Sequence, residues 1–367
     1  MRRESSGYRM GSHAALTVIL VLSVIGFLLA GCGSSSWTSI TAKRLKLSVG
    51  SNMGSFEFDS AHDILYAAIG DRGVWRCTTP DTNPAWRHMV GGVSLDYVNC
   101  LAYDPNHDVL YAGAGSGVFS CAEPQSSAVW KSTSGVGLNY SLVYDSIDNV
   151  LYAGTNAGVY RCTDPASSPA WENTGGGVDG SSIYSLTLDP AHHVLFAGTD
   201  TQGIGVWSYQ GGTWTHTDAN WSTSKSIGSA SSLAYDSARD LLYAVTGTGI
   251  LRCAKTVTAP SWTSIGGGAS SYTFGSIAYD QAQNILYAGA FVPGPPPGLM
   301  STTPKVNTHS HGVWACANPD TKHARTNTGG EVSSEDIGNL IYDPIRGVLY
   351  AATIERGAWR YKTQANH

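Results

Sequence analysis

Three short segments of this sequence carry side chains whose types could bind or transform a ligand. Two are acid–arginine–glycine triplets, Asp71-Arg72-Gly73 and Glu355-Arg356-Gly357, and the third is His309-Ser-His311. If Asp71 and Glu355 faced each other, they could act as the acid and base of glycoside hydrolysis, with about 5 to 5.5 Å between them for retention and about 6.5 to 9.5 Å for inversion. Two histidines alone make a poor zinc site, because zinc takes roughly three or four ligands. We therefore expect ligand-binding residues here, without a metal or a cofactor.

The same segments also have a purely structural interpretation. Each acid and its neighbouring arginine could form a solvated ion pair worth 0 to about 1 kcal/mol. The signatures G-x-S-x-G, H-E-x-x-H and the Walker loop are missing from the sequence. Gly175-Gly-Gly-Val-Asp-Gly180 matches G-x-G-x-x-G, but it lies in a loop of an all-β chain with no helix after it, so it does not indicate dinucleotide binding. These motifs alone therefore do not indicate a specific reaction.

An internal repeat determines where these segments lie. An aspartate followed seven residues later by Tyr or Phe and then by Ala occurs seven times. The pairs are Asp59/Tyr66, Asp104/Tyr111, Asp145/Tyr152, Asp189/Phe196, Asp236/Tyr243, Asp280/Tyr287 and Asp343/Tyr350. Each unit reads as a strand ending at the aspartate, a polar turn and a second strand, which we call strands A and B.

Two further strands complete each unit. Strand C carries a cysteine in five units, and a tryptophan nine residues later marks strand D in four of them. These pairs are Cys77/Trp86, Cys121/Trp130, Cys162/Trp171 and Cys253/Trp262, whereas Cys316 has Arg325 in the tryptophan position. Four short strands every 41 to 47 residues, apart from one unit of 63, predict the blades of a β-propeller.

The two ends of the chain share one unit. The last unit stops at His367 without room for strand D, while Ser36-Trp37-Thr38-Ser39-Ile40 repeats Ser261-Trp262-Thr263-Ser264-Ile265 before the first strand A. A closed ring needs such a split unit to remove two exposed sheet edges, whereas an open solenoid does not. We therefore predict an all-β, seven-bladed β-propeller of four-stranded blades over residues 36–367, with blade 7 closed by residues 36–40.

The loops between strands B and C differ among the blades. They are short and unremarkable in composition in blades 2, 3 and 5, but the two triplets occupy this loop in blades 1 and 7. Blade 6 carries a long insertion there, with Pro293-Gly-Pro-Pro-Pro-Gly298 and the two histidines. Because insertions in repeat proteins collect on one face, often the binding face, the sector of blades 6, 7 and 1 is the predicted site.

Other repeated residues are expected to be structural. An aspartate that recurs at the same turn predicts an Asx cap rather than a ring of catalytic carboxylates. Cysteines at one position on neighbouring blades should lie on the order of 10 Å apart, whereas a disulfide requires Cα atoms within about 7 Å. We predict buried free thiols, including Cys100 near strand A of blade 2, and no disulfides.

The N-terminus resembles a bacterial lipoprotein signal. Arg2, Arg3 and Arg9 precede an apolar segment from Ala14 to Ala30, which ends in Leu29-Ala-Gly-Cys32. We expect residues 1–31 to be a signal peptide, Cys32 to be lipidated and residues 32–35 to form a short tether. An uncleaved transmembrane helix is the alternative. Either would place the globular part outside the cytoplasm, at the cell envelope.

The net charge of the chain argues against nucleic acid as a binding partner. The chain has 22 basic and 27 acidic residues, a formal net charge of −5, and its N-terminal segment is basic. Nucleic-acid binding usually needs a basic face, so we expect no nucleic acid as a partner. We expect a monomer that contacts the membrane through the lipid on Cys32 and binds an envelope protein or glycan.

The segment Tyr160-Arg-Cys-Thr-Asp-Pro-Ala-Ser-Ser-Pro-Ala-Trp171 resembles a degenerate Asp-box, Ser-x-Asp-x-Gly-x-x-Trp. The mature chain is thus similar to the BNR and YVTN-like superfamily of propellers, which includes sialidases, sortilin-type receptors and xyloglucanases. The motif's glycine is absent, and Thr79, Glu123, Lys255 and Asn318 replace its aspartate in other blades. The resemblance implies the fold, and it transfers no catalytic residue because Asp-boxes lie away from family active sites.

Three functions follow as hypotheses. The leading one is a non-enzymatic binding or assembly scaffold that holds a protein or glycan on the sector of blades 6, 7 and 1. The second is a carbohydrate-active enzyme, a glycoside hydrolase or sialidase-like protein, with Asp71 and Glu355 as its acid and base. The third is a structural envelope protein without a small ligand.

Overall fold

The computed structural model describes residues 36–41, 53–133, 135–200, 205–217, 230–247, 249–254, 256, 258–265, 273–291, 311–321, 324–354 and 356–363. The chain divides into two compact units, residues 1–36 and 37–367, and the second contains the repeat. Cys32, the expected tether, His309 and Glu355 lie outside the described residues. No helix among the described residues is long and apolar enough to cross a bilayer.

The described strands form seven antiparallel sheets of four strands each. Blades 1 to 3 are β2 (Met53–Asp59), β3 (Ile64–Ile69), β4 (Val74–Thr78), β5 (Ala85–His88); β6 (Val98–Asp104), β7 (Val109–Ala114), β8 (Gly117–Ala122), β9 (Lys131–Ser132); β10 (Asn139–Asp145), β11 (Val150–Thr155), β12 (Gly158–Thr163), β13 (Ala170–Asn173). Blades 4 and 5 are β14 (Ile183–Asp189), β15 (Val194–Thr199), β16 (Val206–Gln210), β17 (Thr213–His216); β18 (Ser232–Asp236), β19 (Leu241–Thr246), β20 (Gly249–Ala254), β21 (Ser261–Ser264). Blades 6 and 7 are β22 (Thr273–Asp280), β23 (Ile285–Phe291), β24 (Gly312–Ala317), β25 (Thr326–Asn327); β26 (Ile337–Asp343), β27 (Val348–Thr353), β28 (Gly357–Lys362) with β1 (Trp37–Ser39).

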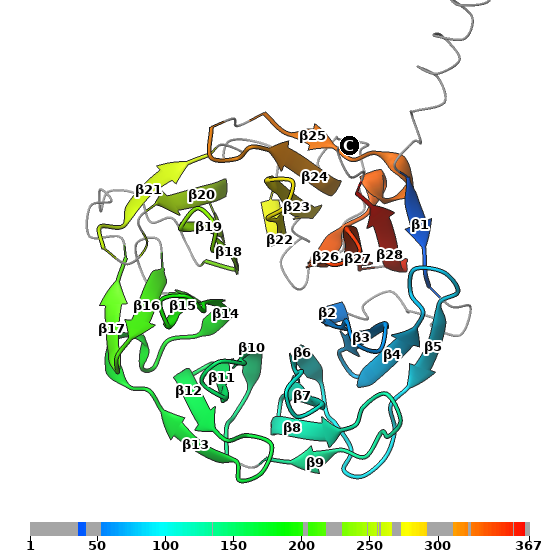
Figure 1. The fold of residues 1–367 in the computed structure, drawn as a ribbon, viewed down its shortest axis with the longest axis vertical. Coiled ribbons are helices and arrows are strands. Elements are labelled where there is room, and N and C mark those ends of the chain that lie inside the picture. Colours follow the sequence, from blue (N-terminus) through cyan, green and yellow to red (C-terminus); the bar gives the residue numbers. More distant parts are fainter. Residues whose placement is uncertain are drawn as a thin grey trace, which may run out of the picture. The chain divides into compact units, whose positions relative to one another are not determined.

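The blades close into a ring (Figure 1). Each innermost strand contacts the innermost strand of the next blade, and β2 of blade 1 contacts β26 of blade 7. The N-terminal strand β1 is the outer strand of blade 7, where Trp37 pairs with Tyr361 and Ser39 with Trp359. Both the seven-bladed propeller and its closure by the N-terminal strand are confirmed.

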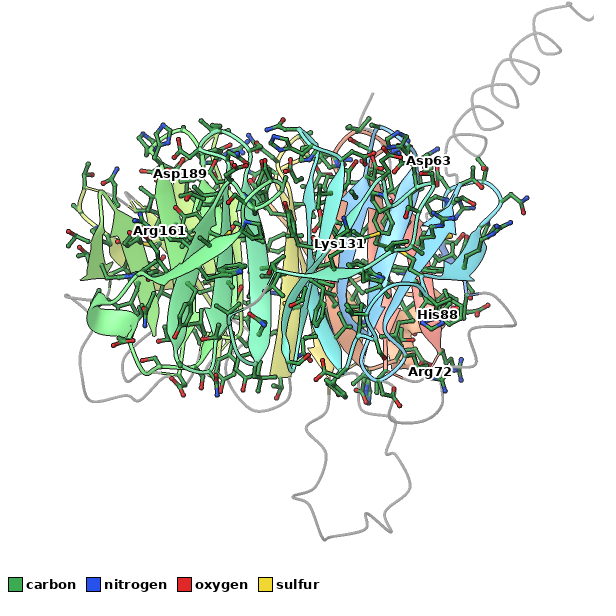
Figure 2. All side chains as sticks on the ribbon, turned by 90° about the horizontal axis from the view of Figure 1, so that it is seen from below. Asp63, Arg72, His88, Lys131, Arg161 and Asp189 are labelled. Atoms are coloured by element: carbon green, nitrogen blue, oxygen red, sulfur yellow. The ribbon has the colours of Figure 1, made fainter. Side chains whose placement is uncertain are left out.

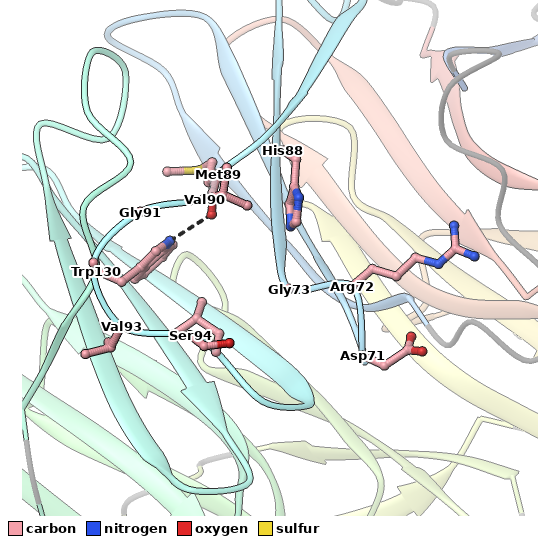
Figure 3. A pocket seen from close by; sticks show the side chains of 12 residues that line it. Asp71, Arg72, Gly73, His88, Met89, Val90, Gly91, Val93, Ser94 and Trp130 are labelled. Atoms are coloured by element: carbon pink, nitrogen blue, oxygen red, sulfur yellow. Dashed lines mark hydrogen bonds between the residues drawn. The ribbon is translucent and has the colours of Figure 1, made fainter.

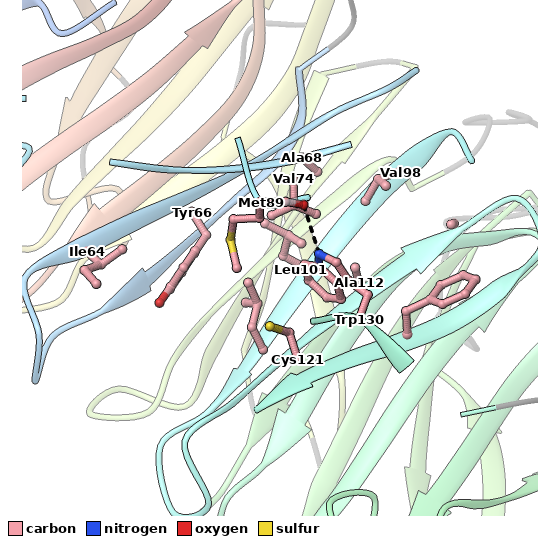
Figure 4. Packing of buried hydrophobic residues seen from close by; sticks show 13 residues of the cluster. Ile64, Tyr66, Ala68, Val74, Met89, Val98, Leu101, Ala112, Cys121 and Trp130 are labelled. Carbon is pink, nitrogen blue, oxygen red and sulfur yellow. Dashed lines mark hydrogen bonds between the residues drawn. The ribbon is translucent and has the colours of Figure 1, made fainter. Parts of the chain in front are cut away.

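The hydrophobic core lies between neighbouring blades. One cluster joins Ile64 and Tyr66 of blade 1 to Leu110 and Trp130 of blade 2, and all four side chains are buried (Figure 4). Every residue of β3 is buried, because both faces of the sheet are covered. This packing explains why the B strands are continuously apolar instead of alternating.

A belt of hydrogen bonds, which we call the tryptophan belt, links the outer strands around the ring. Each strand-D indole donates to the residue that lies three positions after the equivalent tryptophan of the preceding blade. The pairs are Trp86–Ile40 O (2.7 Å), Trp130–Met89 O (3.2 Å), Trp171–Thr133 Oγ1 (3.1 Å), Trp214–Thr174 Oγ1 (3.1 Å), Trp262–Thr217 O (3.1 Å) and Trp37–Thr328 Oγ1 (2.9 Å). Arg325 takes the tryptophan position in blade 6 and donates from Nη2 to Ile265 O at 3.2 Å. The guanidinium therefore preserves the donor that the missing indole would supply.

The strand-A aspartates cap the A–B turns, as expected. Asp145 Oδ1, for example, accepts the backbone N–H groups of Ile147 and Asp148 at 2.9 and 3.2 Å. The last residue of each turn has a positive φ, which Asp, Asn and Gly tolerate better than other residues. These turn residues are Asp63, Asp108, Asn149, His193, Asp240, Asn284 and Gly347.

A second ring of hydrogen bonds lies along the inner strands. In five of the seven blade junctions, a strand-A side chain accepts a backbone N–H from the next blade's inner strand. The pairs are Ser141–Leu186, Ser185–Leu233, Ser232–Ile277, Ser276–Leu340 and Asn339–Phe56. Cys100 occupies this position in blade 2, which explains its separation from the strand-C cysteines.

The six described cysteines are buried and free, as predicted. Burial raises the pKa of the Cys77 thiol to about 12. A thiol with so high a pKa carries little thiolate, so these cysteines act as small packing residues rather than nucleophiles.

Candidate functional site

The described site residues lie on one face of the ring. Asp71 and Arg72 connect β3 to β4, Arg356 precedes β28, and His311 directly precedes β24. All four are therefore on the B–C side of their blades. Figure 2 shows Arg72 on this face, whereas Asp63 and Asp189 of the capped A–B turns lie on the opposite face.

Two of the expected binding residues are engaged with neighbouring acids. Arg356 Nε lies 3.2 Å from the Oε1 atom of the buried Glu335, and His311 Nδ1 lies 2.8 Å from Asp336 Oδ1. Both acids follow the short 3₁₀ helix η2 (Gly330–Ser334), in the loop that leads into β26. Arg356 and His311 thus hold the junction of blades 6 and 7, although the exposed side of Arg356 faces solvent.

Asp71 and Arg72 instead border a pocket of about 360 Å³ between blades 1 and 2. Its wall comprises Asp71, Arg72, Gly73, His88, Met89, Val90, Gly91, Gly92, Val93, Ser94, Leu95 and Trp130. In Figure 3, the acid and the arginine stand on one side and Val93, Ser94 and Trp130 on the other. The triplet of blade 1 therefore forms this pocket together with the loop between blades 1 and 2.

The loop over residues 89–95 is fixed against blade 2. The Trp130 backbone N–H donates to Gly91 O at 3.1 Å, and the Val93 N–H donates to Trp130 O at 3.2 Å. Gly92 has φ +72°, and a Cβ atom there would clash with the Trp130 carbonyl. Only glycine allows this close approach, so the pocket wall has a defined shape.

His88, the last residue of the outer strand β5, also lines the pocket. Its ring stacks on Trp75 with centroids 4.6 Å apart, and the Trp75 indole donates to Arg72 O at 3.1 Å. Burial lowers the pKa of His88, which favours the neutral imidazole at neutral pH. The formal charges of the pocket therefore come from Asp71 and Arg72.

Apolar side chains are exposed beside this pocket. Val90 is 66% exposed, Val93 43% and Val129 51%. Val90 and Val93 line the pocket, and Val129 precedes Trp130 in the chain. Exposed apolar groups clustered around a cavity are typical of a binding surface rather than of a free surface.

This loop was not predicted from the sequence, although its composition carries a signal. Met89-Val-Gly-Gly-Val-Ser-Leu95 carries four large apolar residues between two strands, where polar residues would be usual. The B–C loops of blades 1, 6 and 7 were predicted as the site because they break the repeat. The loop between blades contributes the larger part of the pocket wall.

One cluster on the opposite face has the spacing of a metal site. One ligand atom each from Asp59, His62 and Asp108 lie within 4.8 Å of one another. His62 Nδ1 is 2.7 Å from Asp59 Oδ2, and Arg346 makes the equivalent contact with Asp343 at 3.1 Å in blade 7. Because a guanidinium can replace the imidazole, the arrangement is that of a capped turn rather than a ligand set.

No protein-family model and no curated protein matches the sequence. The fold is similar to the extracellular domain of a putative one component system from B. thetaiotaomicron, with TM-score 0.66, 13% identity and coverage of 91% of this chain and 40% of that one. RRP9 WD40 repeats match with TM-score 0.66, 11% identity and coverage of 90% and 99%. The GH74 xyloglucanase from Xanthomonas campestris matches with TM-score 0.64, 16% identity and coverage of 90% and 54%. At these identities the likeness shows the fold, and the chain spans about half or less of two of these proteins.

Proposed function

We propose that this protein is an exported, lipid-anchored scaffold that binds an envelope protein without catalysis. Cys32 would carry the lipid, residues 1–31 would be removed, and the repeat would be a degenerate Asp-box of the BNR and YVTN-like type. The pocket between blades 1 and 2 would receive the partner. The observation that carries this proposal is the group of exposed valines around a pocket bordered by Asp71 and Arg72.

The dimensions of the pocket favour a protein over a free small molecule. At about 360 Å³ it lies near the lower end of the range of about 300 to 1,000 Å³ for small-molecule sites. The exposed valines extend the apolar surface beyond it. A partner that inserts one apolar side chain and covers the valines would bury the whole patch, which is how anchor residues work in protein interfaces.

The charged residues at the border would orient that partner. Asp71 accepts hydrogen bonds and Arg72 donates them, so together they can meet both the N–H and the C=O groups of a peptide. Charges at the edge of an interface affect specificity and association rate more than affinity. The proposal therefore assigns affinity to the valines and selectivity to the Asp71–Arg72 pair.

The proposal is tested by retention of the native partner. We expect the double variant V90S/V93S to retain at least about tenfold less partner than the wild type in a pull-down from solubilised membranes, because removing apolar contacts costs affinity. The matched control is Ile345→Ser, since Ile345 is 71% exposed but lies in an A–B turn on the opposite face. Equal retention by V90S/V93S and the wild type would exclude the pocket as the binding site.

The anchor has an independent test. In bacterial cells, Cys32→Ser should abolish incorporation of labelled palmitate and shift the protein from the membrane fraction to the soluble fraction, because stable anchoring needs more than one acyl chain. A labelled, membrane-bound Cys32→Ser protein would contradict lipidation at this residue.

A further inference from the structure

Two tyrosines break the repeat at the inner edge of the ring, away from the pocket. Tyr140 and Tyr184 lie at the bulges where β10 and β14 begin. Their ring centroids are 5.5 Å apart and the planes are inclined by 45°. Tyr184 is 37% exposed. The equivalent residues of blades 1, 2, 5, 6 and 7 are smaller: Gly54, Asn99, Ser231, Gly275 and Gly338.

The segment before each tyrosine is hydrogen-bonded to a polar residue on the B–C loop of the same blade. The Asn156 N–H donates to Leu138 O at 3.3 Å, two residues before Tyr140. The Asp200 N–H likewise donates to Ser182 O at 3.2 Å, two residues before Tyr184. Asp200 Oδ1 also accepts the Ser182 N–H at 3.1 Å. Both polar side chains are exposed, so a carboxamide and a carboxylate lie on loops bonded to the segments that lead into the two tyrosines.

We propose that Tyr140 and Tyr184 form the stacking platform of a second binding site, which takes an uncharged sugar ring. The apolar C–H face of a pyranose can lie on an aromatic ring while its hydroxyl groups bond to the edges of the site. Asp200 accepts hydrogen bonds from sugar hydroxyls, and Asn156 can both donate and accept. Tyrosine suits this role because it combines an apolar ring with a polar hydroxyl.

The chemistry of Asn156 and Asp200 favours a neutral sugar over a proline-rich peptide or an acidic sugar. Proline-rich peptides also dock on aromatic side chains, but proline has no N–H to donate to the Asp200 carboxylate. An acidic sugar would meet a carboxylate, and residues 135–142, 153–158, 180–187 and 197–200 contain no lysine or arginine. A neutral sugar has hydroxyl groups that can donate to Asp200, and it carries no negative charge that this carboxylate would repel.

Calorimetric titration of the purified full chain tests the proposal. The probes are maltopentaose, cellopentaose, xylopentaose and mannopentaose, with a proline decapeptide as the competing ligand. We expect at least one sugar to bind, Tyr184→Ala to weaken that binding at least tenfold, and Tyr184→Phe to retain it within about threefold. The pocket variant V90S/V93S should bind the sugar as the wild type does.

The outcomes are separable from those of the proposed function. If no sugar binds, if only the proline peptide binds, or if Tyr184→Ala binds the sugar unchanged, the second site is refuted even when the valine pocket retains its protein partner. Conversely, sugar binding by V90S/V93S after it has lost the protein partner supports two independent sites. A thermal melt of Tyr184→Ala checks that the variant is folded at the temperature of the titration, because Tyr184 is only 37% exposed and its ring packs against Tyr140.

Discussion

Replacing Trp37 with alanine should lower the free energy of unfolding by about 3 to 5 kcal/mol, the usual cost of truncating a buried tryptophan. Trp37 is only 6% exposed and packs in a cluster with Val332 and Trp359. Its ring centroid lies 5.1 Å from that of Tyr361. The effect is measured by equilibrium denaturation in guanidinium chloride, followed by tryptophan fluorescence.

The best control is Trp214→Ala. Trp214 is 8% exposed and holds the same position in the tryptophan belt, but its blade is one continuous stretch of chain. In blade 7, the ring is closed by a β1 strand of three residues. We therefore expect Trp37→Ala to be the more destabilising of the two and also to increase proteolysis near the N-terminus. A smaller loss for Trp37→Ala than for Trp214→Ala would show that the closing strand is not the weak point.

Glu57 should make the protein less stable as the pH rises. It lies in β2, at a strand-A position where the other blades carry Ala102, Val143, Thr187, Ala234, Ala278 and Ile341. Burial among the inner strands raises the pKa of Glu57 from 4.5 to about 8. Between these two values the folded state holds a proton that the unfolded state has lost, so the free energy of unfolding falls with increasing pH across that window.

Glu57→Gln should remove this dependence. Each unit of pKa difference corresponds to about 1.4 kcal/mol, and the partly accessible side chain will show only part of the full effect. We expect the variant to match the wild type at pH 4 and to exceed its melting temperature by several degrees at pH 9. Comparing the two proteins at each pH cancels every other titrating group. Parallel curves from pH 4 to pH 9 would contradict a perturbed Glu57.

The fold could be predicted from the sequence because the residues that each blade requires recur seven times along the chain. Each aspartate must cap a turn, and each strand-D position must supply a donor to the preceding blade. Even the exception follows this rule, since Arg325 replaces an indole and still donates to Ile265 O. The split unit at the termini could be recognised for the same reason.

The candidate site was only partly predictable because pockets depend on loops that follow no period. Asp71 and Arg72 were identified from their departure from the repeat, and the structure places both at a pocket. The opposite wall of the pocket comes from the loop between blades 1 and 2. Its glycines are needed because the loop backbone lies against Trp130, which no sequence pattern indicates. Arg356 and His311 were predicted as binding residues, and their contacts with Glu335 and Asp336 could not be read from sequence spacing.

The tryptophan belt has an implication for how such a ring can change in evolution. Every unit brings one donor for its predecessor and one acceptor for its successor. Duplication or loss of a whole unit therefore leaves no buried donor without an acceptor. A break inside a unit, in contrast, would leave one donor and one acceptor unpaired. Such a protein can therefore gain or lose whole units of about forty-four residues while every hydrogen bond between neighbouring blades is kept.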